Sequence, residues 1–352
     1  DKTADASRDH IAHGATRMTL PRLGLSYFGN RYHAHAFDDL RAIAATGASI
    51  VDHVMSEEDL RWNPGTIADL VAVSKELDLE TWLAPWGLGG GFGGEAASYA
   101  VMESPDQCQR DQLGNHLPAL CFNQPAFHNL FLDWLDVASA AGVDVVTWDE
   151  PHLALPFPSA QSTRWACRCD TCQRRFAEQF GKNMPREWDG DVATFHQQTI
   201  ERALDFLISS AAQRGLDSAI IFLPDENAGD HGWQDLATRS DVRYLGLSPY
   251  WILQGISTDE FEPWLRRWCQ KTVAATAGRH AASLAWIQAF SVPAGREQEL
   301  RTGMEIMRAE GIETICVWSY RACEAMSGLT PDDPERVWST VREGFDAVGS
   351  QG

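Results

Sequence analysis

Two pairs of adjacent acidic residues stand at the ends of short apolar segments. Asp149 and Glu150 end the segment that begins at residue 144, and Asp225 and Glu226 follow the segment at 219–224. Because neighbouring carboxyl groups repel each other's charge, and burial adds to that effect, one of two such groups can keep its proton near neutral pH. A proton-donating carboxyl beside an ionised carboxylate is what cleavage of a glycosidic bond requires. We therefore predict Glu150 as a general acid, with Asp225 and Glu226 as candidates for the second catalytic carboxylate.

Other polar and aromatic residues stand near the ends of similar segments. Carboxylates, amides, an arginine and aromatic rings together form sugar-binding sites, in which rings stack on the apolar faces of pyranoses. The predicted substrate-binding residues are Tyr27, Arg31, His53, Trp86, Asp149, Tyr250, Trp251, Gln288, Trp318 and Tyr320. The chain has 14 tryptophans, most of which we expect to be packing residues.

Eight short apolar segments alternate with segments that have the 3.6-residue periodicity of amphipathic helices. The predicted strands are residues 23–29, 49–55, 81–87, 144–149, 219–224, 242–250, 283–290 and 314–320. The predicted helices are residues 37–45, 67–77, 127–141, 195–214, 261–277 and 296–310. Strands that alternate with helices pair in parallel through crossover connections.

Eight such units predict an α/β fold of the (β/α)8 TIM-barrel type. An open doubly wound sheet is disfavoured, because no GxGxxG follows the first strand and the glycine-rich run at 89–94 lacks a phosphate-binding lysine. A single barrel domain accounts for all 352 residues, with one Cys-rich insertion at about 152–191. In such a barrel the carboxyl ends of the strands meet at one mouth, which would bring the candidate residues together.

The stretch 147–152 (TWDEPH) resembles the W-x-N-E-P signature of clan A glycoside hydrolases. In that clan the glutamate at the end of the fourth strand is the acid/base. Glu150 and Pro151 match the signature, and Asp149 takes the place of the usual asparagine.

Three cysteines, Cys167, Cys169 and Cys172, lie within six residues of one another, a spacing that rarely serves packing alone. With the following QRRFAEQFG they resemble the zinc-binding segment of family 42 β-galactosidases, and the resemblance covers residues 82–181. In that family a fourth cysteine comes from the loop after the third strand, where this chain has Cys121. The resemblance implies a closed, structural Zn²⁺ site of four thiolates that takes no part in the chemistry. Disulfides or free buried thiols are the alternatives.

The resemblance breaks at the seventh predicted strand. Clan A enzymes carry their nucleophilic glutamate there, whereas this chain has Gln288. Since an amide cannot form a glycosyl ester, three explanations stay open. The nucleophile could have moved, with Asp225 or Glu226 in its place; the enzyme could be inverting, with carboxyls about 6.5–9.5 Å apart; or the chain could be an inactive form. We do not expect β-galactosidase specificity to carry over.

Two other functions fit parts of the sequence. A metal-dependent, amidohydrolase-like barrel would use His33 and His35, an H-x-H pair after the first strand. That chemistry also needs histidines at the ends of the fifth and sixth strands, and the nearest, His231, stands farther along the chain. A non-catalytic carbohydrate-binding barrel would account for Gln288.

Composition limits the partners. The formal net charge of -20 argues against binding to nucleic acid, which needs clustered lysine and arginine. No apolar run approaches the roughly 18 residues of a membrane span, and the first residues, DKTADASRDH, lack a signal-peptide core. A carbohydrate substrate is the predicted partner, and a homo-oligomer is compatible with the sequence. Reduced thiols that hold zinc favour the cytoplasm, with secretion as the alternative.

Overall fold

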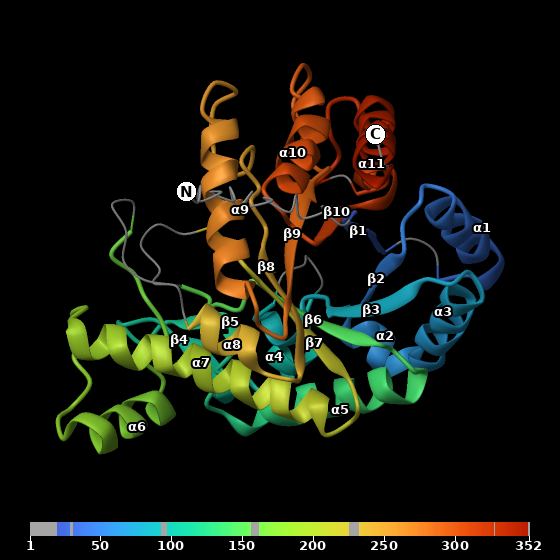
Figure 1. The fold of residues 1–352 in the computed structure, drawn as a ribbon. Coiled ribbons are helices and arrows are strands. Elements are labelled where there is room, and N and C mark those ends of the chain that lie inside the picture. Colours follow the sequence, from blue (N-terminus) through green and yellow to red (C-terminus); the bar gives the residue numbers. More distant parts are fainter. Residues whose placement is uncertain are drawn as a thin grey trace, which may run out of the picture.

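The computed structural model describes residues 20–28, 31–92, 97–155, 162–224, 232–326 and 328–350. Within them, eight parallel strands close into a barrel in the spatial order β1, β10, β9, β8, β7, β6, β3, β2 (Figure 1). The bounds are Arg22–Tyr27 (β1), Ile50–Met55 (β2), Glu80–Pro85 (β3), Val145–Asp149 (β6), Asp217–Phe222 (β7), Val242–Leu247 (β8), Ala282–Gln288 (β9) and Thr314–Trp318 (β10). The predicted (β/α)8 barrel is confirmed, and each predicted strand overlaps an observed one.

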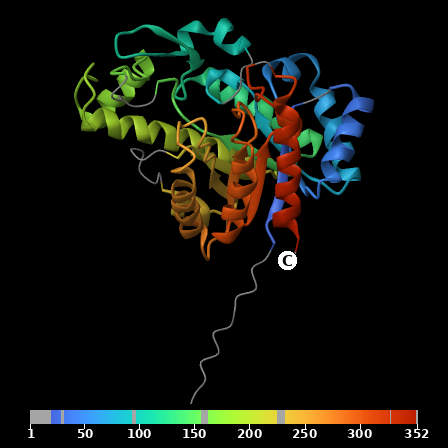
Figure 2. The same cartoon turned by 90° about the horizontal axis from the view of Figure 1, so that it is seen from above.

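Helices connect the strands and surround the barrel (Figures 1 and 2). The six predicted helices correspond to α1 (His33–Ala44), α3 (Pro64–Glu76), α5 (Pro125–Ala141), α7 (Gly190–Ala212), α9 (Phe261–Thr276) and α10 (Gln298–Ala309). The structure adds α2 (Glu57–Trp62), α4 (Tyr99–Glu103), α6 (Asp170–Phe180), α8 (Trp233–Thr238) and α11 (Pro334–Gly349). Short 3₁₀ turns form at η1 (Leu88–Gly90), η2 (Pro105–Gln107) and η3 (Tyr320–Cys323).

Two long connections carry structure of their own. Between β3 and α5, strands β4 (Cys108–Arg110) and β5 (His116–Leu120) pair in an antiparallel ribbon. Between β6 and α7, the short helix α6 lies beyond one end of α7 (Figure 1). Both segments follow strands at the carboxyl end of the barrel, the end where barrel enzymes build their sites.

Alternation along each strand divides the core into two layers. Successive side chains of a strand point to opposite faces, so one set fills the barrel and the other packs against the helices. The inner set contains Ile50, Trp82, Val145, Ala219, Tyr244, Leu284, Trp286 and Cys316. The outer set contains Leu25, Val51, Leu83, Val146, Ile220, Leu245, Ile287 and Ile315. The same alternation decides which polar residues of the strands can reach the inside of the barrel.

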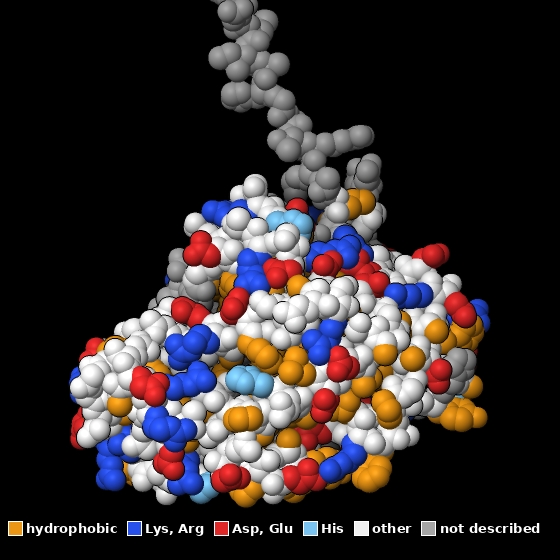
Figure 3. Space-filling view, turned by 90° about the horizontal axis from the view of Figure 1, so that it is seen from below, with side chains coloured by type: hydrophobic (Ala, Val, Ile, Leu, Met, Phe, Trp, Pro, Cys, Tyr) orange, Lys and Arg blue, Asp and Glu red, His pale blue; other side chains and the backbone are white. Residues whose placement is uncertain are grey.

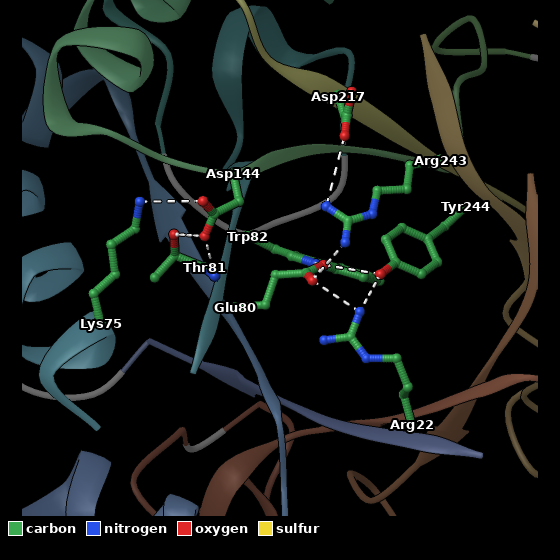
Figure 4. A network of polar contacts seen from close by, with 9 residues as sticks. All are labelled: Arg22, Lys75, Glu80, Thr81, Trp82, Asp144, Asp217, Arg243 and Tyr244. Carbon is green, nitrogen blue, oxygen red and sulfur yellow. Dashed lines mark hydrogen bonds and ion pairs between the residues drawn. The ribbon is translucent and has the colours of Figure 1, made fainter. Parts of the chain in front are cut away.

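Ion pairs and hydrogen bonds occupy the amino-terminal end of the barrel (Figure 4). Glu80 accepts hydrogen bonds from Trp82 Nε1 at 2.8 Å and from the Tyr244 hydroxyl at 2.9 Å. The same carboxylate forms ion pairs with Arg22 at 2.8 Å and Arg243 at 3.0 Å. This network joins β1, β3 and β8 at the end of the barrel opposite to the carboxyl ends of the strands.

The surface in Figure 3 intersperses lysine and arginine with aspartate and glutamate, and its hydrophobic side chains lie singly or in small groups. A helix able to cross a membrane, judged by length and apolar character, is not found among the described residues.

Candidate active site

A cavity of about 180 Å³ lies at the carboxyl end of the barrel. Its walls come from the strand ends and the segments that follow them, and they combine aromatic rings with three carboxyl groups. The lining residues are Asp52, Ala84, Pro85, Trp86, Thr147, Asp149, Glu150, Tyr250, Leu253, Trp286, Phe290, Trp318 and Leu329. Of the sequence-predicted site residues, the structure brings Trp86, Asp149, Glu150, Tyr250 and Trp318 together here.

Asp149 faces the cavity because it belongs to the inward-pointing set of β6. That set also contains Val145 and Thr147, four and two residues earlier. The hydroxyl of Thr147 donates a hydrogen bond of 3.3 Å to Oδ1 of Asp52, on β2. Asp52 Oδ2 has no hydrogen-bond partner among the described residues, although the side chain is only 1% exposed. A buried carboxyl oxygen without a partner, on the wall of a cavity, is available to a bound ligand.

Glu150 lines the same cavity although it follows Asp149 directly. In a regular strand the two side chains would point to opposite sides. The strand ends at Asp149, and Glu150 adopts a left-handed backbone conformation with φ of 48°. Its amide still donates to the carbonyl of Ile221 on β7 at 2.9 Å. This turn of the backbone aims two consecutive carboxyl groups into one cavity.

Burial raises the pKa of all three carboxyl groups. Burial alone raises the pKa of Asp149 to about 7. Burial, and then the charge of Asp149, holds the pKa of Glu150 well above its ordinary value. The pKa of Asp52 is raised well above its ordinary value by burial and by Asp149, against the opposing effect of the Thr147 hydrogen bond. The charge of Asp149 therefore favours the protonated form of Glu150, which has a proton to donate.

Aromatic rings form much of the remaining wall. Trp86 and Trp318 stack with ring centroids 5.6 Å apart and an interplanar angle of 22°. Trp286 meets Trp318 edge-on at 6.1 Å, and Tyr250 meets Phe290 edge-on at 5.2 Å. Rings of this kind offer apolar faces to a pyranose, and the tyrosine adds a hydroxyl group.

Tyr27 and His53, two predicted substrate-binding residues, point out of the barrel. Both belong to the outward-facing set of their strands, opposite in direction to Asp52. The Tyr27 hydroxyl donates to Asp39 at 2.8 Å, and His53 Nε2 lies 2.9 Å from Ser74 Oγ. Burial, with a further contribution from the charge of Arg31, lowers the pKa of His53 to about 3, so this histidine is neutral.

Arg31, Trp251 and Tyr320 also lie away from the cavity walls and are held by other partners. Arg31 forms an ion pair with Asp59 at 3.0 Å and donates to the Val54 carbonyl at 2.7 Å. Trp251 Nε1 donates to Glu299 at 2.8 Å. The Tyr320 hydroxyl donates to Asp39 at 3.3 Å.

Gln288, at the end of β9, is fully buried and held by backbone groups. Its Oε1 accepts from the amide of Leu253 at 3.0 Å, and its Nε2 donates to the carbonyl of Phe290 at 2.9 Å. The amide thereby ties the segment after β8 to the end of β9. Asp225 and Glu226, the predicted second carboxylates, lie outside the described residues.

Asp52 lines the cavity although it is not among the predicted site residues. The alternation in 50–55 (IVDHVM) contained the signal, because Ile50 and Asp52 share one face and His53 the other. Phe290 and Leu329 carried no such signal, because the segments after the strands place them.

Four cysteines form a second candidate site. The Sγ atoms of Cys121, Cys167, Cys169 and Cys172 all lie within 4.8 Å of one another, and all four residues are buried. Cys121 follows β5, and Cys172 lies in the first turn of α6, with 3.5 Å between the two Sγ atoms. Four thiolates around Zn²⁺ at about 2.3 Å would be about 3.8 Å apart, so the cluster fits a tetrahedral metal ion.

The surroundings of this cluster agree with a structural role. Asn123 Nδ2 donates to Cys172 Sγ at 3.3 Å, and Arg175 donates to Asn123 Oδ1 at 2.9 Å. The cluster could hold a metal ion and thereby connect the segment after β5 to α6.

Comparison with known proteins supports the fold. No protein-family profile and no curated protein sequence matches the chain. An endo-1,4-β-mannanase from Rhizomucor miehei superposes with a TM-score of 0.57 at 12% identity, over 94% of this chain and 96% of that chain. An endo-β-1,4-mannanase from Thermotoga petrophila gives 0.56 at 11% identity, over 96% and 78%. A GH5_18 protein from Streptomyces cattleya, solved with GlcNAc, gives 0.52 at 14% identity, over 95% and 81%.

Likeness at this level of identity establishes a shared barrel fold. The resemblance to family 42 β-galactosidases stays a prediction. The H-x-H pair of the amidohydrolase interpretation falls on α1, where His35 is exposed, and no histidine among the described residues lines the cavity.

Proposed function

We propose that the protein is a glycoside hydrolase in which Glu150 is the general acid. One observation carries the proposal: the carboxyl group of Glu150 lines an aromatic cavity at the carboxyl end of the barrel, beside a second carboxyl group. Burial, and then the charge of Asp149, holds its pKa well above the ordinary value, which favours the protonated form. A protonated carboxyl at such a site is the donor that a departing glycosidic oxygen needs.

The cavity walls support a carbohydrate substrate. Trp86, Trp286 and Trp318 present ring surfaces, and the carboxyls and Tyr250 supply hydrogen-bonding groups for sugar hydroxyls. Two of the structural neighbours carry mannanase names and a third was solved with GlcNAc, so a carbohydrate is the common ligand class.

The four-cysteine cluster would hold a structural Zn²⁺ in this enzyme. Four protein thiolates leave no coordination position for substrate, so a zinc ion bound there would supply folding energy and no Lewis acid. Cys121, Cys167, Cys169 and Cys172 would be the ligands, with Asn123 hydrogen-bonded to one of them.

The test of the proposed function is Glu150→Gln, which keeps the size of the side chain and removes its proton-donating ability. Aryl glycosides of several sugars would be assayed, each with a poor and a good leaving group. We expect the variant to lose activity on poor leaving groups by about 10³-fold. It should keep much of its kcat/KM on dinitrophenyl glycosides, whose leaving group departs without a proton.

The matched control is Glu178→Gln, at an exposed position on α6. It should behave like the wild-type enzyme on both kinds of substrate. Equal losses of Glu150→Gln on good and poor leaving groups would contradict a general-acid role. The absence of turnover with every glycoside in the panel would contradict the hydrolase assignment.

A further inference from the structure

The described walls of the cavity leave the nucleophile unassigned. From β8, β9 and β10 and the segments after them come Tyr250, Leu253, Trp286, Phe290, Trp318 and Leu329, none of which is a carboxylate. Gln288 has both ends of its amide bonded to backbone groups.

Asp52 is poorly placed to attack a sugar. It is 1% exposed and lies on β2, where Thr147 bonds one of its carboxyl oxygens. Burial and the charge of Asp149 raise its pKa well above the ordinary value, which favours the protonated form. A protonated carboxyl of this kind can bind a ligand, but it is a poor nucleophile.

Asp149 reaches the cavity from the same wall as Glu150, because the two residues follow each other at the end of β6. In a retaining displacement the nucleophile attacks the anomeric carbon from the face opposite to the departing oxygen. With Glu150 at that oxygen, Asp149 lies on the side of the acid. Its carboxylate is better placed to hold a substituent of the sugar ring next to the reacting carbon.

The groups around Asp149 match the hydrogen-bonding groups of an acetamido substituent. The Asp149 carboxylate is a hydrogen-bond acceptor and the Tyr250 hydroxyl is a donor, and the two groups are close enough that the charge of Asp149 raises the tyrosine pKa. Burial is the larger cause of that shift, and it keeps the tyrosine protonated. An acetamido group needs one acceptor for its N–H and one donor for its C=O. Its methyl group would meet the apolar atoms of Trp286 and Phe290.

We propose that the substrate is a 2-acetamido-2-deoxy sugar, and that its own acetamido oxygen is the nucleophile while Asp149 and Tyr250 orient the acetamido group. The proposal rests on the proposed function, because it requires a glycosidic bond and an acid at position 150. Asp149 accepts the acetamido N–H, and the Tyr250 hydroxyl donates to the acetamido oxygen. A residue-borne carboxylate opposite Glu150 is then unnecessary.

The first step forms a bond between the acetamido oxygen and the anomeric carbon, using an electron pair of that oxygen. The bond from the anomeric carbon to the leaving oxygen breaks, its electron pair stays on that oxygen, and the oxygen takes the proton of Glu150. The positive charge left on the resulting oxazolinium ring is stabilised by the Asp149 carboxylate, which accepts the ring N–H.

In the second step the oxygen of water attacks the anomeric carbon, and the Glu150 carboxylate takes a proton from that water. The bond to the acetamido oxygen breaks and its electron pair restores the carbonyl group. Water is the one co-reactant, Glu150 ends protonated as it began, and the sugar keeps its anomeric configuration.

The experiment compares three 4-methylumbelliferyl β-glycosides with the wild-type enzyme: the 2-acetamido-2-deoxyglucoside, its N-trifluoroacetyl analogue and the 2-hydroxy glucoside. The β-anomer places the acetamido oxygen on the face opposite to the leaving group. We expect kcat/KM for the N-trifluoroacetyl analogue and for the 2-hydroxy glucoside to be lower than for the acetamido substrate by about 100-fold or more. The first analogue has a weakened internal nucleophile and the second has none. Asp149→Asn should lower kcat on the acetamido substrate by about 100-fold.

Hydrolysis of the 2-hydroxy glucoside as fast as the acetamido substrate, with continued dependence on Glu150, would overturn this inference and leave the proposed function intact. A 2-deoxy-2-fluoro glycoside that labels Asp225 or Glu226 covalently would do the same, because it would identify a nucleophile on the chain. If the wild-type enzyme turned over none of a wider panel of glycosides, both proposals would fall.

Discussion

The replacement of Asp149 by asparagine should stabilise the folded protein, and it should do so more at high pH than at low pH. Asparagine has nearly the shape of aspartate and carries no charge. Asp149 lines the cavity, and burial raises its pKa from 3.8 to about 7. Its ionised form is therefore less stable in the folded chain than in the unfolded chain, where the carboxylate meets water.

The size of the effect follows from proton linkage. Between pH 4 and 7 the folded state binds more protons than the unfolded state, so the free energy of unfolding falls as pH rises through this window. One pKa unit corresponds to about 1.4 kcal/mol, which sets an upper limit of about 4 kcal/mol above pH 7. Water at the cavity mouth and an effective dielectric constant near 20 reduce the expected effect to about 1–2 kcal/mol.

The assay is the thermal midpoint of wild type and Asp149→Asn, measured by calorimetry at pH 5 and at pH 8. The midpoint of the variant relative to wild type should be higher at pH 8 than at pH 5 by about 1–2 °C. Asp38→Asn, at an exposed position on α1, is the control and should show no such difference. The same midpoint difference at both pH values would refute the inference that the Asp149 charge is buried.

Three further predictions concern other parts of the fold. Cys172→Ser should lose most of the bound zinc by metal analysis, whereas Cys108→Ser, at a cysteine outside the cluster, should keep it. Glu80→Gln should lower the free energy of unfolding by about 2 kcal/mol in urea titrations, because it weakens two ion pairs and two hydrogen bonds at one partly buried carboxylate. Gly246→Ala should lower the same quantity by more than about 2 kcal/mol, since its Cβ would lie 1.7 Å from the carbonyl oxygen of Leu284 on the next strand.

The barrel could be predicted from sequence because its strands and helices carry strong local patterns. Buried segments such as Ala282–Gln288 are largely apolar, and helices such as Phe261–Thr276 keep one apolar face. The ribbon of β4 and β5 was missed because its strands have three and five residues and pair within a long connection. Short strands of this kind contain too few residues for alternation to be recognised.

The residues of the site were harder to predict than the strands that carry them. Position near a strand end was the criterion, and it selected Tyr27 and His53, which face the helices, and left out Asp52, which lines the cavity. Strict alternation, anchored on an inner residue such as Ile50, would have selected Asp52. To decide which residues of a strand face the inside of the barrel, one needs the register of all its strands, because the apolar residues on the two faces are similar in type.

Alternation alone would also have failed at Glu150, the residue on which the proposed function depends. It would have placed this side chain outside the barrel, and the left-handed turn at φ of 48° places it in the cavity instead. A glutamate in that conformation and two carboxyls in one buried space each lower the stability of the fold. Departures of this kind persist where the surrounding structure enforces them, and they concentrate at functional sites. The strained turn and the buried charge therefore support one conclusion: this strand end favours proton transfer and lowers the stability of the fold. Asp149→Asn should therefore give a protein that is more stable and less active than wild type.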